Sequence, residues 1–273
     1  MTRTAHKYGR RAPSRRPSLA FARVFTGQVP AHPPAEDYLA AMKGGWNMLG
    51  NDTAGDCVAV TWANVRRLVT AASGDERYPD QDAVWRVYAT QNPDFDPHGS
   101  ADTNGPGSSA DNGMDIQTLL ERLVLEGGPD GAKPLAFARV DPTSPDEVKA
   151  ALAIFGFVWT GVVVQKANEA EFAADKPWDY HRNSPDAGGH SVITGGYGPP
   201  GPGPLGGDER FITWAEETSF TDAYWGRNTD EAWVVVWREH LQHPAFLEGV
   251  DLETLAADYT ALTGRRFPSV TPA

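Results

Sequence analysis

Residues 51–72 read NDTAGDCVAVTWANVRRLVTAA and contain Cys57, the only cysteine of the 273-residue chain. From Cys57 onward the stretch is mostly apolar, and Gly74 follows it, so a helix is predicted over 57–72. Cys57 then lies at the helix N-terminus, where unpaired N–H groups and the helix dipole favour a thiolate over a thiol. A lone cysteine on a helix is more often a buried small hydrophobic residue, so this stretch alone assigns no chemistry.

A nucleophilic cysteine needs a base, usually a histidine, which the fold rather than the sequence brings close. Of the seven histidines, only His190 begins a β-rich segment flanked by glycines, GGHSVITGGYG (188–198). A histidine on a strand is also commonly structural. Cys57 and His190 are therefore a candidate nucleophile and base, and each signal is weak when taken alone.

Helical patterns dominate the first half of the chain and strand patterns the second. The other predicted elements are helices over 82–90, 114–125, 145–155 and 252–262 and strands over 158–165, 190–197, 210–214 and 232–237. Because helices gather first and strands follow, the pattern predicts an α+β fold. We expect a domain over 43–245, with a helical part at about 43–140 and a β part at about 141–245, and then a C-terminal helix and tail over 246–273.

Local signals mark some of these boundaries. Ser144 is expected to cap the helix that follows it, and Glu147 stands where a capping box needs a carboxylate. Asp251 caps the last helix and Gly264 ends it. The segment 198–209, GPPGPGPLGGDE, is predicted to be an irregular loop.

Residues 1–42 form a proline-rich N-terminal arm whose charge is opposite to that of the rest. The first 35 residues carry seven basic and no acidic side chains, and the remainder holds 17 basic and 36 acidic ones. So acidic a body repels nucleic acid and anionic membranes. The arm suits nucleic acid, an acidic partner or the protein's own acidic surface, or it is a solvated tail. Its candidates for burial are Leu19, Phe21, Val24, Phe25 and Val29.

The number of cysteines and the hydropathy of the chain limit the cellular compartments in which we expect the protein. One cysteine excludes an intrachain disulfide, so nothing depends on an oxidising compartment. The chain has no apolar run of about 18 residues and no apolar signal segment after its basic start. We expect a cytoplasmic or virion-associated protein, without a classical secretion signal and without a membrane partner.

The region before Cys57 resembles the active-site entry of papain-like cysteine peptidases. In that family an amide side chain stands six residues before the nucleophile, where this chain has Asn51, and a glycine two before it, where this chain has Gly55. The family also has a histidine at the head of a strand with Gly-Tyr-Gly six to eight residues later. His190 and residues 196–198 match this second pattern.

The resemblance implies a helical subdomain and an antiparallel β-barrel-like subdomain with a cleft between them. It implies a cysteine peptidase or related acyl hydrolase acting on peptides or proteins, with Cys57 as nucleophile, His190 as base and Asn51 as oxyanion donor. The expected cleft residues are Gly55, Asp56, Gly189 and Trp214. No cofactor is implied. No metal is expected either, because the aspartates of the 92–112 loop lack calcium-loop spacing and His240 and His243 lack a third ligand.

The chain departs from the family at the residue that orients the histidine. The family has an Asn before its motif Trp, whereas the strand here reads FITWAEETSF and has none. If Trp214 takes the place of that Trp, Ile212 stands at the orienting position and accepts no hydrogen bond. A different pairing brings Thr213 or Glu216 to the histidine, and we rank Glu216 slightly higher because a carboxylate stabilises an imidazolium. Asp56 is expected to oppose thiolate formation.

These departures leave a second hypothesis open. A catalytically weak or inactive papain-like domain would serve as a structural or attachment protein, for example in a bacteriophage or other virus particle. The arm then ties the domain to a lattice or homo-oligomer through residues 1–36, whereas in a peptidase it lies along the cleft as a propeptide. Intact Cys, His and amide positions favour an enzyme. A filled cleft favours the structural protein.

Overall fold

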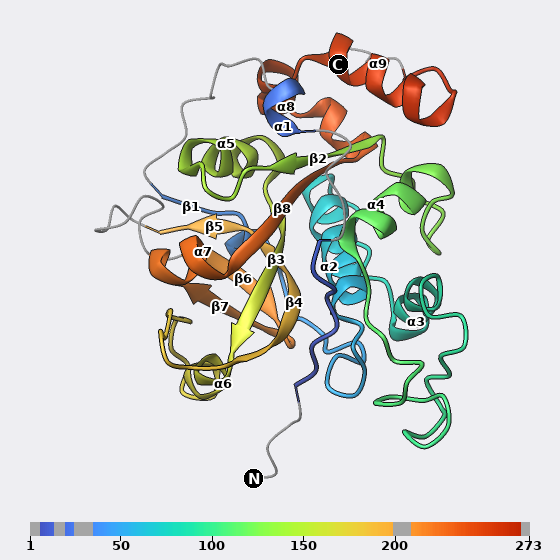
Figure 1. The fold of residues 1–273 in the computed structure, drawn as a ribbon. Coiled ribbons are helices and arrows are strands. Elements are labelled where there is room, and N and C mark those ends of the chain that lie inside the picture. Colours follow the sequence, from blue (N-terminus) through green and yellow to red (C-terminus); the bar gives the residue numbers. More distant parts are fainter. Residues whose placement is uncertain (1–5, 14–19, 25–34, 199–208, 269–273) are drawn as a thin grey trace.

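The computed structural model describes residues 6–13, 20–24, 35–198 and 209–268. In this part of the chain, helices lie on both faces of a six-stranded antiparallel sheet of order β2-β8-β3-β4-β6-β7 (Figure 1). The strands are β2 (Ala136–Val140), β3 (Val158–Gln165), β4 (Asp186–Thr194), β6 (Glu209–Thr213), β7 (Glu216–Phe220) and β8 (Thr229–Val236). β2 and β7 are its edges, so the sheet is open rather than closed into a barrel. The predicted α+β class is confirmed.

Alternation along β8 shows how the sheet separates two hydrophobic cores. Trp233 and Val235 belong to the core shared with α2 (Cys57–Ala72), and Val234 and Val236 to the core shared with α5 (Pro145–Phe155). Successive side chains of a strand point to opposite faces, which explains this division. The α2 helix is buried from Cys57 to Thr70. Most of this stretch is apolar, and the two buried arginines, Arg66 and Arg67, form ion pairs with Asp130 and Glu76.

The main helices begin and end within two residues of the predicted positions. They are α2 and α5, already given, with α3 (Gln81–Ala89), α4 (Ile116–Leu125) and α9 (Leu252–Thr263). Side-chain caps explain four of these five starts: Asp80, Asp115, Ser144 and Asp251 each accept a backbone N–H of the first turn, whereas Asp56 makes no such bond before α2. Glu147 does not complete the predicted capping box. Its carboxylate instead accepts the backbone N–H of Asp141, at 3.0 Å.

Two strands of the six-stranded sheet, β2 and β7, were not predicted, and β4 and β8 begin four and three residues before their predicted starts. β2 lies before residue 141, in the region assigned to the helical part, and pairs with β8. β7 reads EETSF and is an edge strand with an exposed polar start, so it lacks an apolar pattern. β4 begins at Asp186, so His190 lies in the middle of a strand rather than at its head. Gly188 and Gly189 have low strand propensity, yet both pair with β3.

Shorter elements connect or cover these. They are α1 (Phe21–Val24), β1 (Glu36–Asp37), η1 (Leu39–Ala41), β5 (Gly196–Tyr197), α6 (Lys166–Phe172), α7 (Asp222–Asn228), η2 (Arg238–Gln242) and α8 (Pro244–Gly249). The α1 turn packs against β2 and α9 and buries Phe21 and Val24, as expected of the arm's apolar residues. Leu19, Phe25 and Val29, like residues 199–208 of the predicted loop, lie outside the described residues.

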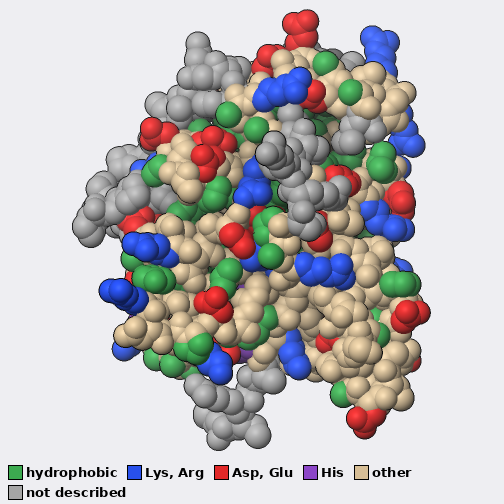
Figure 2. Space-filling view, in the orientation of Figure 1, with side chains coloured by type: hydrophobic (Ala, Val, Ile, Leu, Met, Phe, Trp, Pro, Cys, Tyr) green, Lys and Arg blue, Asp and Glu red, His purple; other side chains and the backbone are tan. Residues whose placement is uncertain are grey.

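Charges of both signs are interspersed over the face seen in Figure 2, where acidic and basic side chains lie side by side. Among the helices that the structure describes, none combines the length and the apolar character needed to cross a membrane.

Candidate active site

Cys57 is the first residue of α2 and is 1% exposed. The loop that precedes it is held by Asp111, whose Oδ1 accepts the backbone N–H of Gly55 at 2.9 Å and whose Oδ2 accepts that of Gly107 at 2.8 Å. Asp111 belongs to the 92–112 loop, for which only calcium binding had been considered from the sequence. Its role here is to position the backbone beside Cys57.

A chain of buried hydrogen bonds fixes the start of α2 on strand β4. The indole N–H of Trp159 donates to Ser191 Oγ at 2.8 Å, Ser191 Oγ donates to Thr61 Oγ1 at 3.0 Å, and Thr61 Oγ1 donates to the carbonyl of Cys57 at 2.8 Å. Ser191 follows His190 directly, and its backbone N–H lies near the thiol of Cys57 and lowers its pKa. These bonds connect strand β4, which carries His190, to the first turn of α2, which carries Cys57.

His190 is 1% exposed and is held by β6. Its Nε2 lies 2.7 Å from Thr213 Oγ1, and its ring stacks on Trp214 with centroids 4.8 Å apart. Among the described residues, Nδ1 has no hydrogen-bond partner. The imidazole is thus oriented through one nitrogen, and the other is available to take or give a proton.

The hydroxyl of Thr213 orients His190, whereas Glu216 was expected first in this role. Thr213 and Glu216 pair across the tight turn between β6 and β7, whose central residues Trp214 and Ala215 have positive φ angles of 46° and 67°. Glu216 is exposed at the start of β7. The ranking is therefore corrected by the turn, which directs Thr213 inward to the histidine and leaves Glu216 in solvent.

Burial keeps both candidate groups neutral. Desolvation raises the pKa of Cys57 to about 12, against the opposing effect of the backbone N–H groups of Ser191 and Gly9, and Asp56 raises it further. Desolvation, with the charge of Arg10, lowers the pKa of His190 to about 3. Asp56 opposes ionisation of the thiol, as expected, and the loss of solvent has a larger effect on its pKa than the backbone N–H groups that favour the thiolate.

The N-terminal arm crosses this site as an extended segment, residues 6–13, which runs beside α2 in Figure 1. Its backbone bonds to both walls. Arg10 N–H donates to the carbonyl of Gly189 at 3.0 Å, Met114 N–H donates to the carbonyl of Gly9 at 2.6 Å, and Arg11 N–H donates to the carbonyl of Met114 at 2.8 Å. The backbone N–H of Gly9 lies near the thiol of Cys57 and lowers its pKa. An extended peptide therefore already occupies the space over the thiol.

Glycines on both sides allow this close approach. A Cβ on Gly9 would lie 1.7 Å from the carbonyl oxygen of Gly55. A Cβ on Gly113 would lie 1.9 Å from the oxygen of Gly9, and one on Gly189 would lie 2.2 Å from the oxygen of Arg10. The backbone of the arm thus packs directly on the backbone of the residues beneath it. This close packing was not predicted, although the glycines are visible in the sequence.

Side chains of the arm complete the contact. The ring of His6 stacks on Trp214 with centroids 4.0 Å apart, and Tyr8 donates to Glu169 Oε1 at 2.6 Å. Arg10 forms ion pairs with Asp230 at 2.8 Å and Glu231 at 2.9 Å. Nucleic acid, an acidic partner and the protein's own acidic surface were the three expected partners of the basic arm. In the structure, Arg10 of the arm binds the protein's own acidic residues.

Asn51 and the predicted cleft residues gather around the same segment. The Asn51 amide donates to the carbonyls of Lys7 and Ala54, at 3.4 and 3.3 Å. Asp56 is fully buried beside Cys57, and burial raises the pKa of its carboxyl well above the ordinary value.

Comparison with known proteins agrees with this architecture. No family model matches the sequence, and no curated protein matches it. The solved structures that are similar to it include two that cover most of the chain. One is xylellain, a cysteine protease from Xylella fastidiosa, with a TM-score of 0.58, 16% identity and coverage of 87% of this chain and 98% of that one. The other is a procathepsin B from Trypanosoma congolense, with a TM-score of 0.57, 12% identity and coverage of 85% and 87%.

The chain has a papain-like fold. The expectation drawn from the resemblance of residues around Cys57 and His190 is thereby confirmed at the level of the fold. Within the papain-like fold of this chain, α2 and β4 carry the two candidate residues on opposite sides of the arm.

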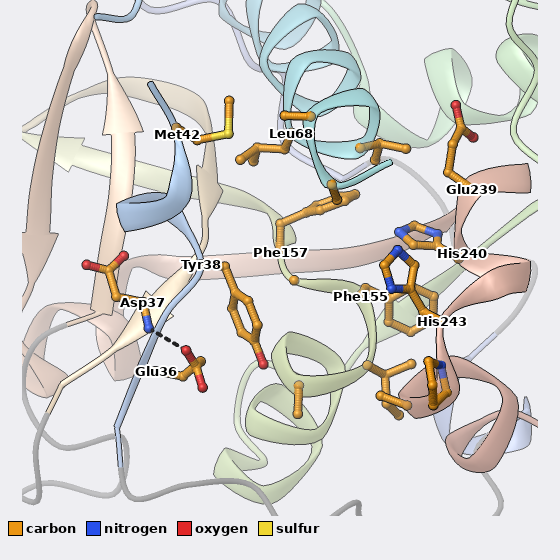
Figure 3. A pocket seen from close by; sticks show the side chains of 18 residues that line it. Glu36, Asp37, Tyr38, Met42, Leu68, Phe155, Phe157, Glu239, His240 and His243 are labelled. Atoms are coloured by element: carbon orange, nitrogen blue, oxygen red, sulfur yellow. Dashed lines mark hydrogen bonds between the residues drawn. The ribbon is translucent and has the colours of Figure 1, made fainter. Parts of the chain in front are cut away.

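A separate cavity of about 420 Å³ lies at the other end of α2 from Cys57. Figure 3 shows it between the end of α2, the turn after α5 and η2, with Tyr38, Phe155, Phe157 and His240 directed into it. Its lining is largely apolar. In the described residues no group of three or more potential metal ligands occurs, here or elsewhere. This cavity is thus no part of the candidate active site.

Proposed function

We propose that this protein is a cysteine peptidase or a related acyl hydrolase whose own N-terminal arm closes its active site. The observation that carries the proposal is the extended segment 6–13 itself. Its backbone is hydrogen-bonded to the carbonyl of Gly189 on one side and to the backbone of Met114 on the other, over the thiol of Cys57. A site that binds peptide backbone in this way beside a cysteine and a histidine is suited to attack on a peptide bond.

The residues have distinct roles in this reaction. The sulfur of Cys57 attacks the acyl carbon while its proton passes to Nδ1 of His190, which Thr213 holds in place through Nε2. The Asn51 amide and the Cys57 backbone N–H donate to the oxyanion. The imidazolium then gives its proton to the leaving amine, and water, deprotonated by His190, hydrolyses the thioester and releases the acid.

The direction of the arm explains why it is not itself a substrate. His6 and Tyr8 lie against Trp214 and His190, so the leaving group belongs on this side, next to the group that protonates it. The acyl side is then the side of Arg10. A substrate runs from the Arg10 side toward the His6 side, and the arm runs the opposite way, so its peptide bonds present the wrong polarity to Cys57.

A second candidate function is supported by the filled interface. Arg10 is buried with two carboxylates and the thiol is neutral, as in a domain that keeps the fold and has lost catalysis. Such a domain would act as a structural or attachment protein. The two proposals differ in what happens at Cys57 once the arm is lifted.

The pH dependence of iodoacetamide alkylation separates them, because Cys57 is the only thiol. Gly9→Ala lifts the arm, since its Cβ meets the oxygen of Gly55 at 1.7 Å. A peptidase predicts slow labelling of the wild type, fast labelling of Gly9→Ala well below pH ~8.5, and loss of the fast reaction in Gly9→Ala/His190→Ala. Labelling of Gly9→Ala that follows an ordinary thiol, whether or not His190 is present, supports the structural protein instead.

A further inference from the structure

The side chain of Arg10 lies in a slot over the paired strands β3 and β8, at the register shift between Gly161 and Val162. Its guanidinium bonds to Glu231 at 2.9 Å, to Asp230 at 2.8 Å and to the carbonyl of Val162 at 3.2 Å. The side chains of Arg10 and Glu231 are 1% and 2% exposed. The slot therefore binds a planar cation through two carboxylates and a carbonyl, the geometry that suits a guanidinium better than an ammonium.

Residues outside the arm shape the slot and leave room in it for a long side chain. Gly161 forms its floor, and a Cβ there would lie 2.5 Å from Glu231 Cγ and 2.8 Å from Arg10 Cδ. The second carboxylate oxygen of Glu231 accepts the indole N–H of Trp233 at 2.9 Å. This bond holds Glu231 in position independently of the arm, so the carboxylate is oriented for an incoming cation.

The slot lies one residue from the thiol. Gly9 crosses Cys57, and Arg10 is the next residue, its backbone N–H bonded to Gly189 beside His190. This is the acyl side of the site, opposite the Tyr8 side where the leaving amine belongs. Arg10 is the cation that pairs with the buried carboxylate of Glu231, and a substrate cation in the same place would restore this ion pair once the arm leaves.

We propose that this slot is the specificity pocket of the enzyme and takes an arginine immediately N-terminal to the residue whose carbonyl carbon Cys57 attacks. The inference rests on the proposed peptidase function and names its substrate class, peptides of the type Arg-X with cleavage after X. The arm occupies the slot with its own Arg10 and so competes with such substrates.

The test uses full-length Arg10→Ala, in which the slot is vacated, and two affinity labels. Acetyl-Arg-Gly chloromethyl ketone places arginine in the slot, and the citrulline analogue replaces it by a neutral side chain of nearly the same shape. In both, the sulfur of Cys57 displaces chloride to form a thioether. We expect the arginine label to react at least about 10-fold faster, as a buried charge pair predicts.

Two further variants test whether Glu231 causes the preference for the arginine label. They are Glu231→Gln and Glu126→Gln, each added to Arg10→Ala. Glu126 is an exposed residue of the α4 end. Glu231→Gln should bring the ratio of the two rates close to one, and Glu126→Gln should leave it unchanged. Equal rates for the two labels in Arg10→Ala, or a ratio insensitive to Glu231→Gln, overturn the proposal. If Arg10→Ala does not fold, Gly9→Ala takes its place as the background.

A binding measurement separates failure of this inference from failure of the proposed function. Acetyl-Arg-glycinamide, which contains no reactive group, should raise the melting temperature of Arg10→Ala, and its citrulline analogue should not. A shift with arginine and no alkylation by either label retains the arginine slot and rejects the peptidase. Alkylation by both labels at one rate retains the peptidase and rejects the slot. No shift and no alkylation reject both.

Discussion

The backbones of Gly9 and Gly55 are in contact. Gly9 directly precedes Arg10 in the arm, and Gly55 lies two residues before Cys57. Because a Cβ on Gly9 would lie 1.7 Å from the Gly55 oxygen, this position of the arm excludes any side chain. The contact controls access to the thiol, since it seats the segment that removes Cys57 from solvent.

Gly9→Ala should therefore release the arm without unfolding the domain. We expect the amide hydrogens of Arg10 and Arg11, which are bonded to Gly189 and Met114, to lose protection against exchange. Amides of α2 should keep theirs. Hydrogen exchange followed by mass spectrometry measures both.

The matched control is Gly226→Ala, in α7, where a new Cβ meets nothing within 4 Å. It should leave the arm protected and stabilise the protein slightly, by about 0.4–1 kcal/mol, since alanine favours a helix. Unchanged protection of the arm in Gly9→Ala would show that the Gly9 contact does not seat it.

Thr213 is expected to position the base. In the Gly9→Ala background, Thr213→Val removes the hydroxyl that binds His190 Nε2 and keeps the shape of the side chain. A hydrogen bond of about 1 kcal/mol predicts a loss of about 5- to 10-fold in kcat/KM for a peptide substrate. Thr213→Ser, which keeps the hydroxyl, should retain most of the activity.

Glu216→Gln tests the alternative orienting residue in the same assay. Because Glu216 is exposed, we expect kcat/KM to be unchanged. A loss with Glu216→Gln that exceeds the loss with Thr213→Val would reverse the assignment made from the structure.

Asn51 is expected to act on the oxyanion. In the Gly9→Ala background, Asn51→Ala should lower kcat by roughly 10²–10³, the usual effect of losing one such donor. The rate of Cys57 alkylation by iodoacetamide, which forms no oxyanion, should change little. Asn47→Ala removes an exposed amide nearby and serves as the control. Equal losses in hydrolysis and in alkylation would indicate that Asn51 supports the loop rather than the reaction.

His240 should make stability depend on pH. Burial lowers the pKa of this residue to about 3, against about 6.5 in the unfolded chain. The unfolded chain thus takes up a proton that the folded chain does not, so the contribution of neutral His240 is full above pH ~6.5 and is lost as pH falls toward ~3. His240→Asn removes this contribution.

Urea unfolding between about pH 7 and 4 measures the difference. The free energy of unfolding of the wild type should fall more steeply than that of His240→Asn, by about 1.4 kcal/mol per pH unit. His98→Asn, at an exposed position, should keep the slope of the wild type. Parallel curves for wild type and His240→Asn would contradict the prediction.

Much of the local structure was predictable from the sequence because its signals are local. The apolar run after Cys57, the caps Ser144 and Asp251, and the β-branched run at Val158–Gln165 each occur where the structure places an element. The papain-like fold and its two candidate residues also followed from the sequence, through the spacing around Cys57 and His190. Strand β7 did not, because an edge strand half in solvent lacks an apolar pattern.

The sequence by itself therefore determined the elements, the fold class and the residue types available for chemistry. Only the tertiary structure decided that Thr213 rather than Glu216 meets His190, because a turn with positive φ angles sets which side chain faces inward. It also decided that residues 6–13 lie on Cys57 and that Arg10 enters a slot with Glu231. These are contacts between residues up to 221 positions apart. Local spacing carries no information on such contacts, and the burial they produce sets the protonation of the thiol and the imidazole.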